Sequence, residues 1–276
     1  MHRSFQVLLM YAMRVEDHVL RELHRAAADA GRRGISMPSS DLDTVTRRVG
    51  NREVAQKAIG RLVRAGQIVR VRKDLLVLPE TTGLLGVDML DLVDAITPQP
   101  YLVTGGRALE HYQLTDQHFF GVVVLVPGHM KKLSYRGQLT SFFRTDPSHI
   151  WGWEDGARPQ VATPERAIVD ALNHPRYGVS LTMALDALLL AASKDSGFLD
   201  RLHTTVLRYD SRAAARRIGF VVERFFGADA AGPYRELLGA NRAPVLLRSS
   251  GPDAGPVDTS WRVVVNALLE PERAPA

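Results

Sequence analysis

The chain has 276 residues, of which 45% are hydrophobic, 24% are charged and none is cysteine. This length predicts about two domains, and the apolar content suffices for packed cores, which excludes a globally disordered chain. Without cysteine there is no disulfide scaffold, thiolate nucleophile or Cys-ligated metal site, which fits a reducing compartment. The longest apolar runs fall far below the roughly 18 residues of a membrane span, so we expect a cytoplasmic protein with no membrane partner.

The formal net charge of +5 is concentrated at one end of the chain. Residues 1–80 carry 15 Lys and Arg against 9 Asp and Glu, whereas residues 81–276 carry 20 against 21. We therefore expect a basic domain over 1–80 that binds a polyanion, followed by a neutral domain over 81–276. A solvated basic face is the alternative interpretation of this excess.

The basic domain shows the pattern of three helices followed by a β-hairpin. Apolar spacing and turn residues predict helices over 14–30, 41–49 and 51–65 and strands over 67–71 and 75–78, with Gly31 ending the first helix and Asp74 in the hairpin turn. This order of elements is typical of a winged helix-turn-helix. We therefore predict a mixed α/β chain with a winged helix-turn-helix first and a larger mixed α/β domain behind it.

The third predicted helix separates its residue types most clearly. Its apolar residues form one stripe, and the opposite stripe consists of Glu53, Gln56, Lys57, Gly60, Arg61 and Arg64, with Arg52 at its border. In the major groove, Gln56 is suited to adenine and Arg52 or Arg61 to guanine, while basic residues nearby neutralise phosphates. The predicted DNA-binding residues are Arg47, Arg48, Arg52, Gln56, Lys57, Arg61, Arg64, Arg70, Arg72 and Lys73. A protein-interaction module with a solvated polar face is the alternative.

The neutral domain is predicted to be a mixed α/β unit. Its expected helices cover 84–96, 105–112, 164–172, 180–192, 198–207 and 211–225. Its expected strands cover 101–103, 119–126, 138–144, 149–153, 158–162, 245–248 and 261–266, with a loop over 227–232.

Glycines and histidines in the neutral domain do not form a recognisable site. Gly105 and Gly106 lie between a strand and a helix, where a phosphate-binding turn would be placed. Without a G-x-G-x-x-G pattern or a Walker lysine, tight packing is the favoured interpretation. The histidines His111, His118 and His129 lack the spacing of metal ligands.

Carboxylates and tryptophans of this domain receive similar interpretations. Glu154 with Asp155, and Glu165 with Asp170, are the pairs that a nuclease could use, but we interpret them as solvated and helix-capping residues. Trp151 and Trp153 are expected to share one face of a strand. We identify no catalytic constellation, and we expect no enzymatic activity, no cofactor and no metal.

Three stretches in this order resemble the AbiEi family of antitoxins from type IV toxin–antitoxin systems. They are LVRAGQIVRVR at 62–72, continuing to the strand before Pro79, YLVTGGRALEHYQLTDQ at 101–117, and VATPERAIVDAL at 161–172. The resemblance implies a winged helix that represses its own operon by binding inverted repeats in the promoter, in a phage-defence system. It also implies a C-terminal domain that counteracts a nucleotidyltransferase-fold toxin.

The resemblance places DNA binding on the third helix and the wing, at Arg52, Gln56, Lys57, Arg61, Arg70, Arg72 and Lys73. Relatives commonly carry glycine at the wing tip, where this chain has Lys73 and Asp74, so a different turn is expected. Two other functions stay open: a regulator whose neutral domain binds a small metabolite, and, less favoured, a DNA-targeted nuclease. Residues 226–276 match the family less clearly, and nothing is carried across for them.

Overall fold

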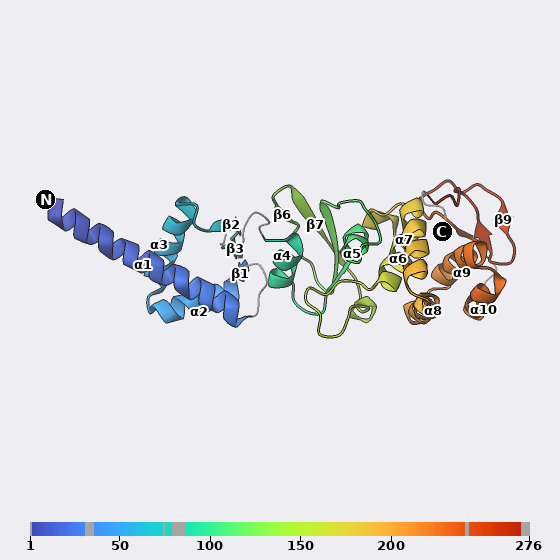
Figure 1. Cartoon of the computed structure of the whole chain (residues 1–276), viewed down its shortest axis with the longest axis horizontal. Helices are drawn as coiled ribbons and strands as arrows, with labels where there is room; N and C mark the ends of the chain where they lie inside the picture. The colour runs from blue at the N-terminus through green and yellow to red at the C-terminus, as the bar shows by residue number, and fades with distance from the viewer. Residues whose placement is uncertain (1, 31–35, 74, 79–86, 241–242, 272–276) are drawn as a thin grey trace. The chain divides into compact units, whose positions relative to one another are not determined.

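The computed structural model describes residues 2–30, 36–73, 75–78, 87–240 and 243–271, and it confirms a mixed α/β fold (Figure 1). The chain divides into two compact units, one formed by residues 1–98 with 134–136 and the other by 99–133 with 137–276. The division follows Pro98 rather than residue 80, because α4 (Met89–Ile96) contacts β1 (Ser36–Pro38) and groups with the first unit. In the described part of the chain, none of the helices has the length and apolar character of a bilayer span.

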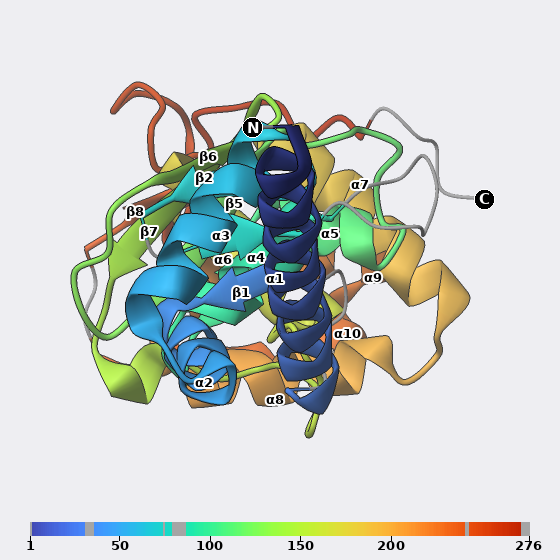
Figure 2. The ribbon, with the colours of Figure 1, turned by 90° about the vertical axis from the view of Figure 1, so that its left-hand side faces the viewer.

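The first unit has the element order of a winged helix. Its elements before α4 are α1 (His2–Asp29), β1 (Ser36–Pro38), α2 (Ser39–Val49), α3 (Arg52–Arg64), β2 (Val69–Arg72) and β3 (Leu75–Val77). The sheet order is β1-β3-β2 with antiparallel pairing, so β1 adds a strand that the sequence pattern did not predict. Helices α2 and α3 both pack against α1 (Figure 2).

Helix α3 begins at the predicted position because Asn51 caps it. The Asn51 side chain accepts hydrogen bonds from the backbone N–H groups of Glu53 and Val54, at 2.9 and 3.1 Å. Four residues of the predicted apolar stripe, Ala55, Ala58, Ile59 and Leu62, are buried, whereas Val63 is partly buried and Val54 at its edge is exposed. Leu62 packs in a core shared with Leu23 of α1. Burial of this stripe turns the opposite, polar stripe of α3 toward solvent.

Some predicted details of the first unit lie outside the described residues. They are Gly31 at the end of the first helix, Asp74 in the hairpin turn, Pro79 after the second strand and residues 84–86 at the start of the fourth helix. The described part of that fourth helix begins at Met89, where Asp88 caps it and accepts a hydrogen bond from the Leu90 N–H at 3.2 Å.

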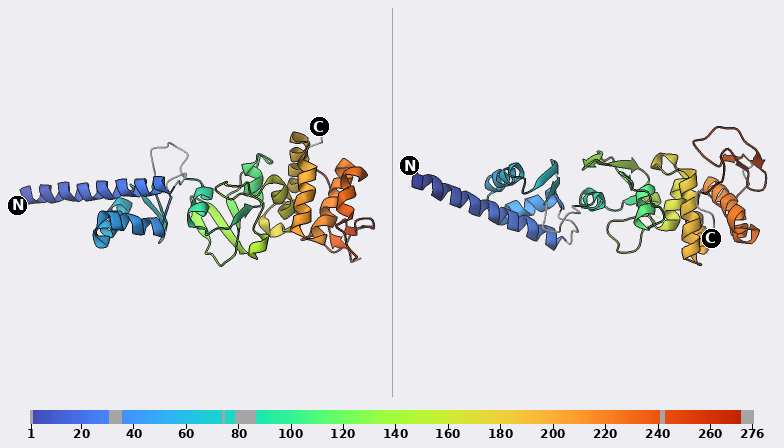
Figure 3. Two further views of the ribbon diagram at one scale, coloured as in Figure 1. Left: turned by 90° about the horizontal axis from the view of Figure 1, so that it is seen from below. Right: turned by 45° about the horizontal axis from the view of Figure 1, so that its top comes forward.

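The chain then continues through a four-stranded sheet, a group of helices and a small second sheet (Figure 3). The elements of the larger sheet and its connections are β4 (Leu102–Thr104), α5 (Gly106–His111), β5 (Gly121–Val126), β6 (Leu133–Tyr135), β7 (Gln138–Arg144) and η1 (Pro147–His149). The helices are α6 (Pro164–Asn173), η2 (Pro175–Tyr177), α7 (Leu181–Lys194), α8 (Phe198–Tyr209), α9 (Arg212–Phe226) and α10 (Ala228–Arg235). The last strands are β8 (Val245–Leu246), β9 (Val257–Asp258) and β10 (Val263–Val264).

Helix α6 is the centre of the second unit. It contacts α5, α7, α8 and α9, and residues 165–172 are all buried. The larger sheet has the order β4-β5-β7-β6, with β4 antiparallel and β7 parallel to β5. The smaller sheet has the order β8-β10-β9.

Three predicted secondary-structure assignments for the second unit are wrong. Residues 149–153 are not a strand, because His149 ends the 3-10 turn η1 and the chain has a positive φ of +92° at Gly152. Residues 158–162 are not a strand either, and they pair with β4 only through a bridge from Val161 to Val103. Residues 227–232 are not a loop, because α10 forms there despite Gly232 and Pro233. Packing of α10 on α9, with Ala231 and Tyr234 buried, outweighs the low helix propensity of these residues.

Candidate nucleic-acid interface

The exposed face of α3 holds most of the predicted base-reading residues. At 100° per residue, Glu53, Gly60 and Arg64 lie near the middle of the face, with Gln56 and Lys57 on either side of them. The side chains of Gln56, Lys57 and Arg64 are exposed, as is that of Arg52 at the border, while Gly60 itself is partly buried. Arg61 lies on the opposite border and is partly buried.

The cations on this face differ in whether a carboxylate already holds them. The Lys57 Nζ lies 2.6 Å from a carboxylate oxygen of Glu53, and the Arg61 Nε donates to Glu16 of α1. By contrast, the Arg52, Gln56 and Arg64 side chains make no hydrogen bond or ion pair with any described residue. These three side chains are the part of α3 most open to a partner.

The two arginines of α2 that were predicted to bind DNA, Arg47 and Arg48, make contacts within the first unit. The guanidinium of Arg48 lies 3.0 Å from Asp29 and 3.5 Å from Glu22, both on α1. The hydrogen bond to Asp29 raises the pKa of Arg48 above its ordinary value. Arg47 donates to the hydroxyl of Thr44 at 3.2 Å. Arg48 therefore joins α2 to α1 in addition to presenting positive charge at the surface.

The predicted wing is the hairpin of β2 and β3. Arg70 and Lys73 are exposed, and an Arg70 Nη1 donates to the Lys73 carbonyl oxygen at 3.4 Å. Arg72 is partly buried and interacts with other residues of the chain. The strand register shifts between Arg70 and Arg72, which marks a bulge in β2 just before the turn.

Sequence reasoning missed the acidic partners of these basic residues. Glu16, Glu22 and Asp29 all lie on α1, and each pairs with an arginine of α2 or α3. Their position on the polar side of a helical pattern was visible in the sequence. Which arginine each would meet depends on how α1 packs against the other two helices, and that information is not local.

In the second unit, two of the stretches that carry the AbiEi resemblance meet in the core. The buried Asp170 accepts hydrogen bonds from the Thr104 hydroxyl at 2.7 Å, from the Tyr209 hydroxyl at 2.9 Å and from the Arg166 Nε at 3.1 Å. The Arg166 guanidinium also donates to the Trp151 carbonyl at 3.2 Å. Every partner of Asp170 here is part of the scaffold, so its carboxylate joins α6 to β4 and α8.

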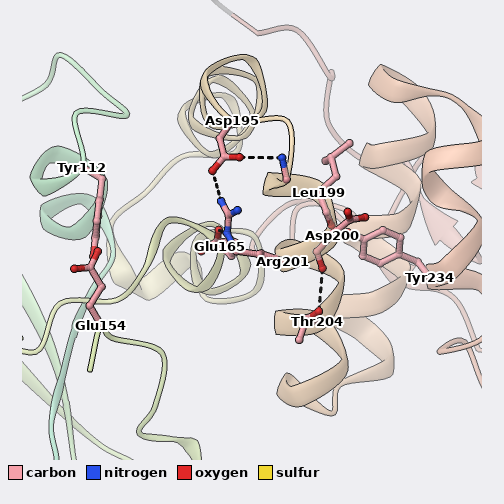
Figure 4. A network of polar contacts seen from close by, with 10 residues as sticks. Tyr112, Glu154, Glu165, Asp195, Leu199, Asp200, Arg201, Thr204 and Tyr234 are labelled. Atoms are coloured by element: carbon pink, nitrogen blue, oxygen red, sulfur yellow. Dashed lines mark hydrogen bonds and ion pairs between the residues drawn. The ribbon is translucent and has the colours of Figure 1, made fainter. Parts of the chain in front are cut away.

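The interpretation of Glu165 and Asp170 as solvated or capping residues is wrong. Both side chains are buried, at 5% and 0% exposure. Glu165 pairs with Arg201 of α8 at 2.7 Å, and Arg201 also contacts Asp195 at 2.6 Å (Figure 4). Arg201, the partner of Glu165, lies on another helix, and Arg166, a partner of Asp170, lies one turn earlier on α6. The sequence pattern along α6 therefore did not reveal that these two carboxylates are buried.

The loop carboxylate Glu154 has a partner as well. It accepts a hydrogen bond from the Tyr112 hydroxyl at 3.2 Å, a contact that links the loop after η1 to the end of α5 (Figure 4). Burial and the Glu154 charge raise the pKa of Tyr112 to about 12. Trp151 is buried while Trp153 is partly exposed, so the expected shared strand face does not form.

The glycine pair after β4 is explained by packing. Gly105 has φ +69°, and a Cβ there would lie 2.7 Å from the Tyr177 carbonyl oxygen. A Cβ on Gly106 would overlap the Phe119 ring. Both glycines are therefore required by close contacts inside the second unit, as the favoured interpretation predicted.

The three histidines singled out in the sequence have separate surroundings. His118 pairs with Glu110 at 2.9 Å, His129 contacts Arg144 at 3.4 Å, and the His111 ring meets Tyr112 edge-on. Within the residues that the structure describes, His, Asp and Glu side chains form no group of three or more that could hold a metal ion.

Comparison with protein-family models and with curated proteins gives no match. Among solved structures, the crystal structure of the RV2827C protein from Mycobacterium tuberculosis is similar, with a TM-score of 0.57 and 14% sequence identity. The similarity covers 83% of this chain and 85% of that chain. At this identity the likeness shows a shared mixed α/β fold.

Proposed function

We propose that this protein is a DNA-binding transcriptional repressor that reads double-stranded DNA with α3 of its first unit. The observation that carries the proposal is the exposed face of α3, where Arg52, Gln56 and Arg64 are engaged by no described residue. In a winged helix this element enters the major groove, where Gln and Arg recognise adenine and guanine edges. The exposed Arg70 and Lys73 of the wing would neutralise phosphates beside the groove.

The proposal is tested with the double variant Gln56→Ala/Arg64→Ala of the full chain. The DNA probe is a duplex enriched by the wild-type protein from a randomised library, and binding is followed by fluorescence anisotropy. We expect affinity for the enriched duplex to fall by at least about tenfold, because each base contact contributes about 1–3 kcal/mol. The control is Arg224→Ala, which removes an exposed helical arginine of the second unit.

Two results would contradict the proposal. One is that the wild-type protein enriches no sequence from the library. The other is that the double variant and the control bind the enriched duplex equally well. A dependence of binding on salt accompanies any contact with phosphates, so the measurement is repeated at two salt concentrations.

The resemblance to AbiEi antitoxins extends the proposal to the second unit. We propose that the repressor acts in the cytoplasm on its own promoter and that its second unit counteracts a nucleotidyltransferase-fold toxin. The two activities separate if Gln56→Ala/Arg64→Ala relieves promoter repression but still restores growth to cells expressing a nucleotidyltransferase-like protein encoded beside this gene. Failure of the wild-type chain to restore growth would contradict the antitoxin role and leave DNA binding in place.

A cavity of the second unit favours a metabolite-responsive repressor as the second candidate. It has a volume of about 550 Å³ and is lined by the end of α6, the start of α7 and residues 247–250 and 266–268. This volume lies in the range of small-molecule sites. A metabolite that raises the melting temperature of the protein and releases the enriched duplex would establish this function; a library that yields none would remove it.

A further inference from the structure

Gly60 lies near the middle of the polar face of α3, and nothing in the described part of the chain explains why this residue is glycine. Its backbone is helical and does not have the positive φ that favours glycine. A Cβ at this position would meet nothing within 4 Å. Glycine in a helix interior is less stable than alanine, so this choice weakens α3 without improving packing.

The other glycines in the described helices each have a reason within the fold. A Cβ on Gly106 of α5 would overlap the Phe119 ring, and a Cβ on Gly219 of α9 would overlap the Trp261 ring. Gly232 of α10 precedes Pro233, whose ring disfavours a helical residue with a Cβ. Gly60 differs from all three, because no described residue lies near its Cβ position and no proline follows it.

The surroundings of Gly60 fit a close approach to DNA. Gln56 and Arg64 lie one turn before and one turn after it, so long polar side chains flank a helix position that has no side chain of its own. A helix with its side chains is about 10–12 Å across, and the major groove is about 12 Å wide. The absence of one side chain at the innermost point lets the helix axis move closer to the base edges.

We infer that Gly60 is the point of closest approach between α3 and the floor of the major groove, and that its missing side chain sets the depth at which Gln56 and Arg64 read bases. This inference rests on the proposed function. A methyl group at position 60 would hold the helix away from the groove floor and lengthen both flanking contacts. Non-specific binding, which depends on phosphates, does not require this depth.

The test is Gly60→Ala in the full chain, with binding to the enriched duplex, binding to an unrelated duplex and melting temperature measured together. We expect affinity for the enriched duplex to fall about tenfold, since overpacking a close contact is destabilising. The melting transition of the first unit should rise by about 2–4 °C, because alanine stabilises the helix interior. Damage to the fold would lower both the affinity for the enriched duplex and the melting temperature. A fall in affinity together with a rise in melting temperature therefore identifies a contact with DNA.

Gly121→Ala is the matched control, because Gly121 is an exposed glycine of β5 with nothing within 4 Å of its Cβ position. It should leave binding to both duplexes unchanged. If Gly60→Ala binds the enriched duplex as well as the wild type, the inference is overturned and DNA binding stands. It is also overturned if Gly60→Ala lowers the melting temperature. If the wild type enriches no duplex, the proposed function and the inference fail together.

Discussion

Both units contain pairs between basic and acidic side chains, but the pairs differ in their access to solvent. In the first unit the Lys57–Glu53 pair has side chains that are 65% and 75% exposed, and the Arg48–Asp29 pair is 35% and 57% exposed. In the second unit Arg166 and Asp170 are only 2% and 0% exposed. Exposed charges such as those of Lys57 and Glu53 can exchange partners, whereas the buried charges of Arg166 and Asp170 are fixed in the scaffold.

The energetics of the two kinds of pair explain this difference. An exposed pair contributes about 0–1 kcal/mol, so a phosphate can replace its carboxylate at little cost. Removal of one member of a buried pair leaves an uncompensated charge and costs about 3–5 kcal/mol. Exposed cations of the first unit such as Lys57 therefore remain available for an anionic partner, whereas the buried Arg166 of the second unit holds helices and strands together.

The largest expected effect comes from breaking the buried pair. Asp170→Ala should lower the free energy of unfolding of the second unit by about 3–5 kcal/mol, because Arg166 then loses its carboxylate in the core. All three tryptophans, Trp151, Trp153 and Trp261, belong to this unit, so tryptophan fluorescence during urea denaturation follows its unfolding.

The control for this experiment is Asp155→Ala, which removes an exposed carboxylate from the same unit. It should change the free energy of unfolding by less than about 0.5 kcal/mol. Equal stability of Asp170→Ala and Asp155→Ala would contradict the structural role of the buried network.

Glu110 gives an intermediate case and a dependence on pH. Burial acts to raise its pKa, but hydrogen bonds from His118, Arg107 and the Phe119 N–H outweigh it and lower the pKa below 4.5. A carboxylate with a lowered pKa stabilises the fold above pH 4.5 and loses that contribution as the pH falls through the lowered value. Glu110→Gln should therefore cost about 1 kcal/mol at neutral pH.

The measurement for Glu110 compares urea denaturation of the wild type and Glu110→Gln at neutral pH and well below pH 4.5. The stability difference should shrink as the wild-type carboxylate becomes protonated. A difference that stays constant across this range would show that the amide disturbs packing instead of removing a charge.

The smallest expected effect comes from the Arg61–Glu16 pair of the first unit, whose side chains are 41% and 18% exposed. Glu16→Gln frees Arg61 and removes a negative charge near α3, so affinity for DNA should rise about two- to fivefold, with a change in stability below about 1 kcal/mol. Asp43→Asn removes an exposed carboxylate of α2 outside these pairs and serves as the control. If both substitutions change affinity equally, the effect reflects net charge alone.

Local patterns predicted the elements that local chemistry controls. The cap at Asn51 and the apolar residues behind it fixed the start and the outward face of α3, and the strand predicted at residues 138–144 is β7 with the same bounds. Long-range packing decided the rest: α10 forms on α9 despite Pro233, and residues 149–153 bend at Gly152 although their composition suits a strand.

The same distinction applies to the candidate site. Gln56 and Arg64 were identified from the stripe alone, because exposure on a helix follows from its period. The pairing of Arg61 with Glu16 joins residues 45 positions apart in the sequence, so it depends on the angle at which α1 packs on α3. Helical periodicity carries no information about that angle.

The hydrogen bond between Thr104 and Asp170 has an evolutionary consequence. The two residues are 66 positions apart in sequence, yet each leaves the other with an unmet polar group if it changes alone. Homologous chains should therefore vary these two positions jointly, and together with Arg166, whose buried charge loses its carboxylate if Asp170 changes. Such covariation would record the architecture of the second unit independently of the partner that the first unit binds.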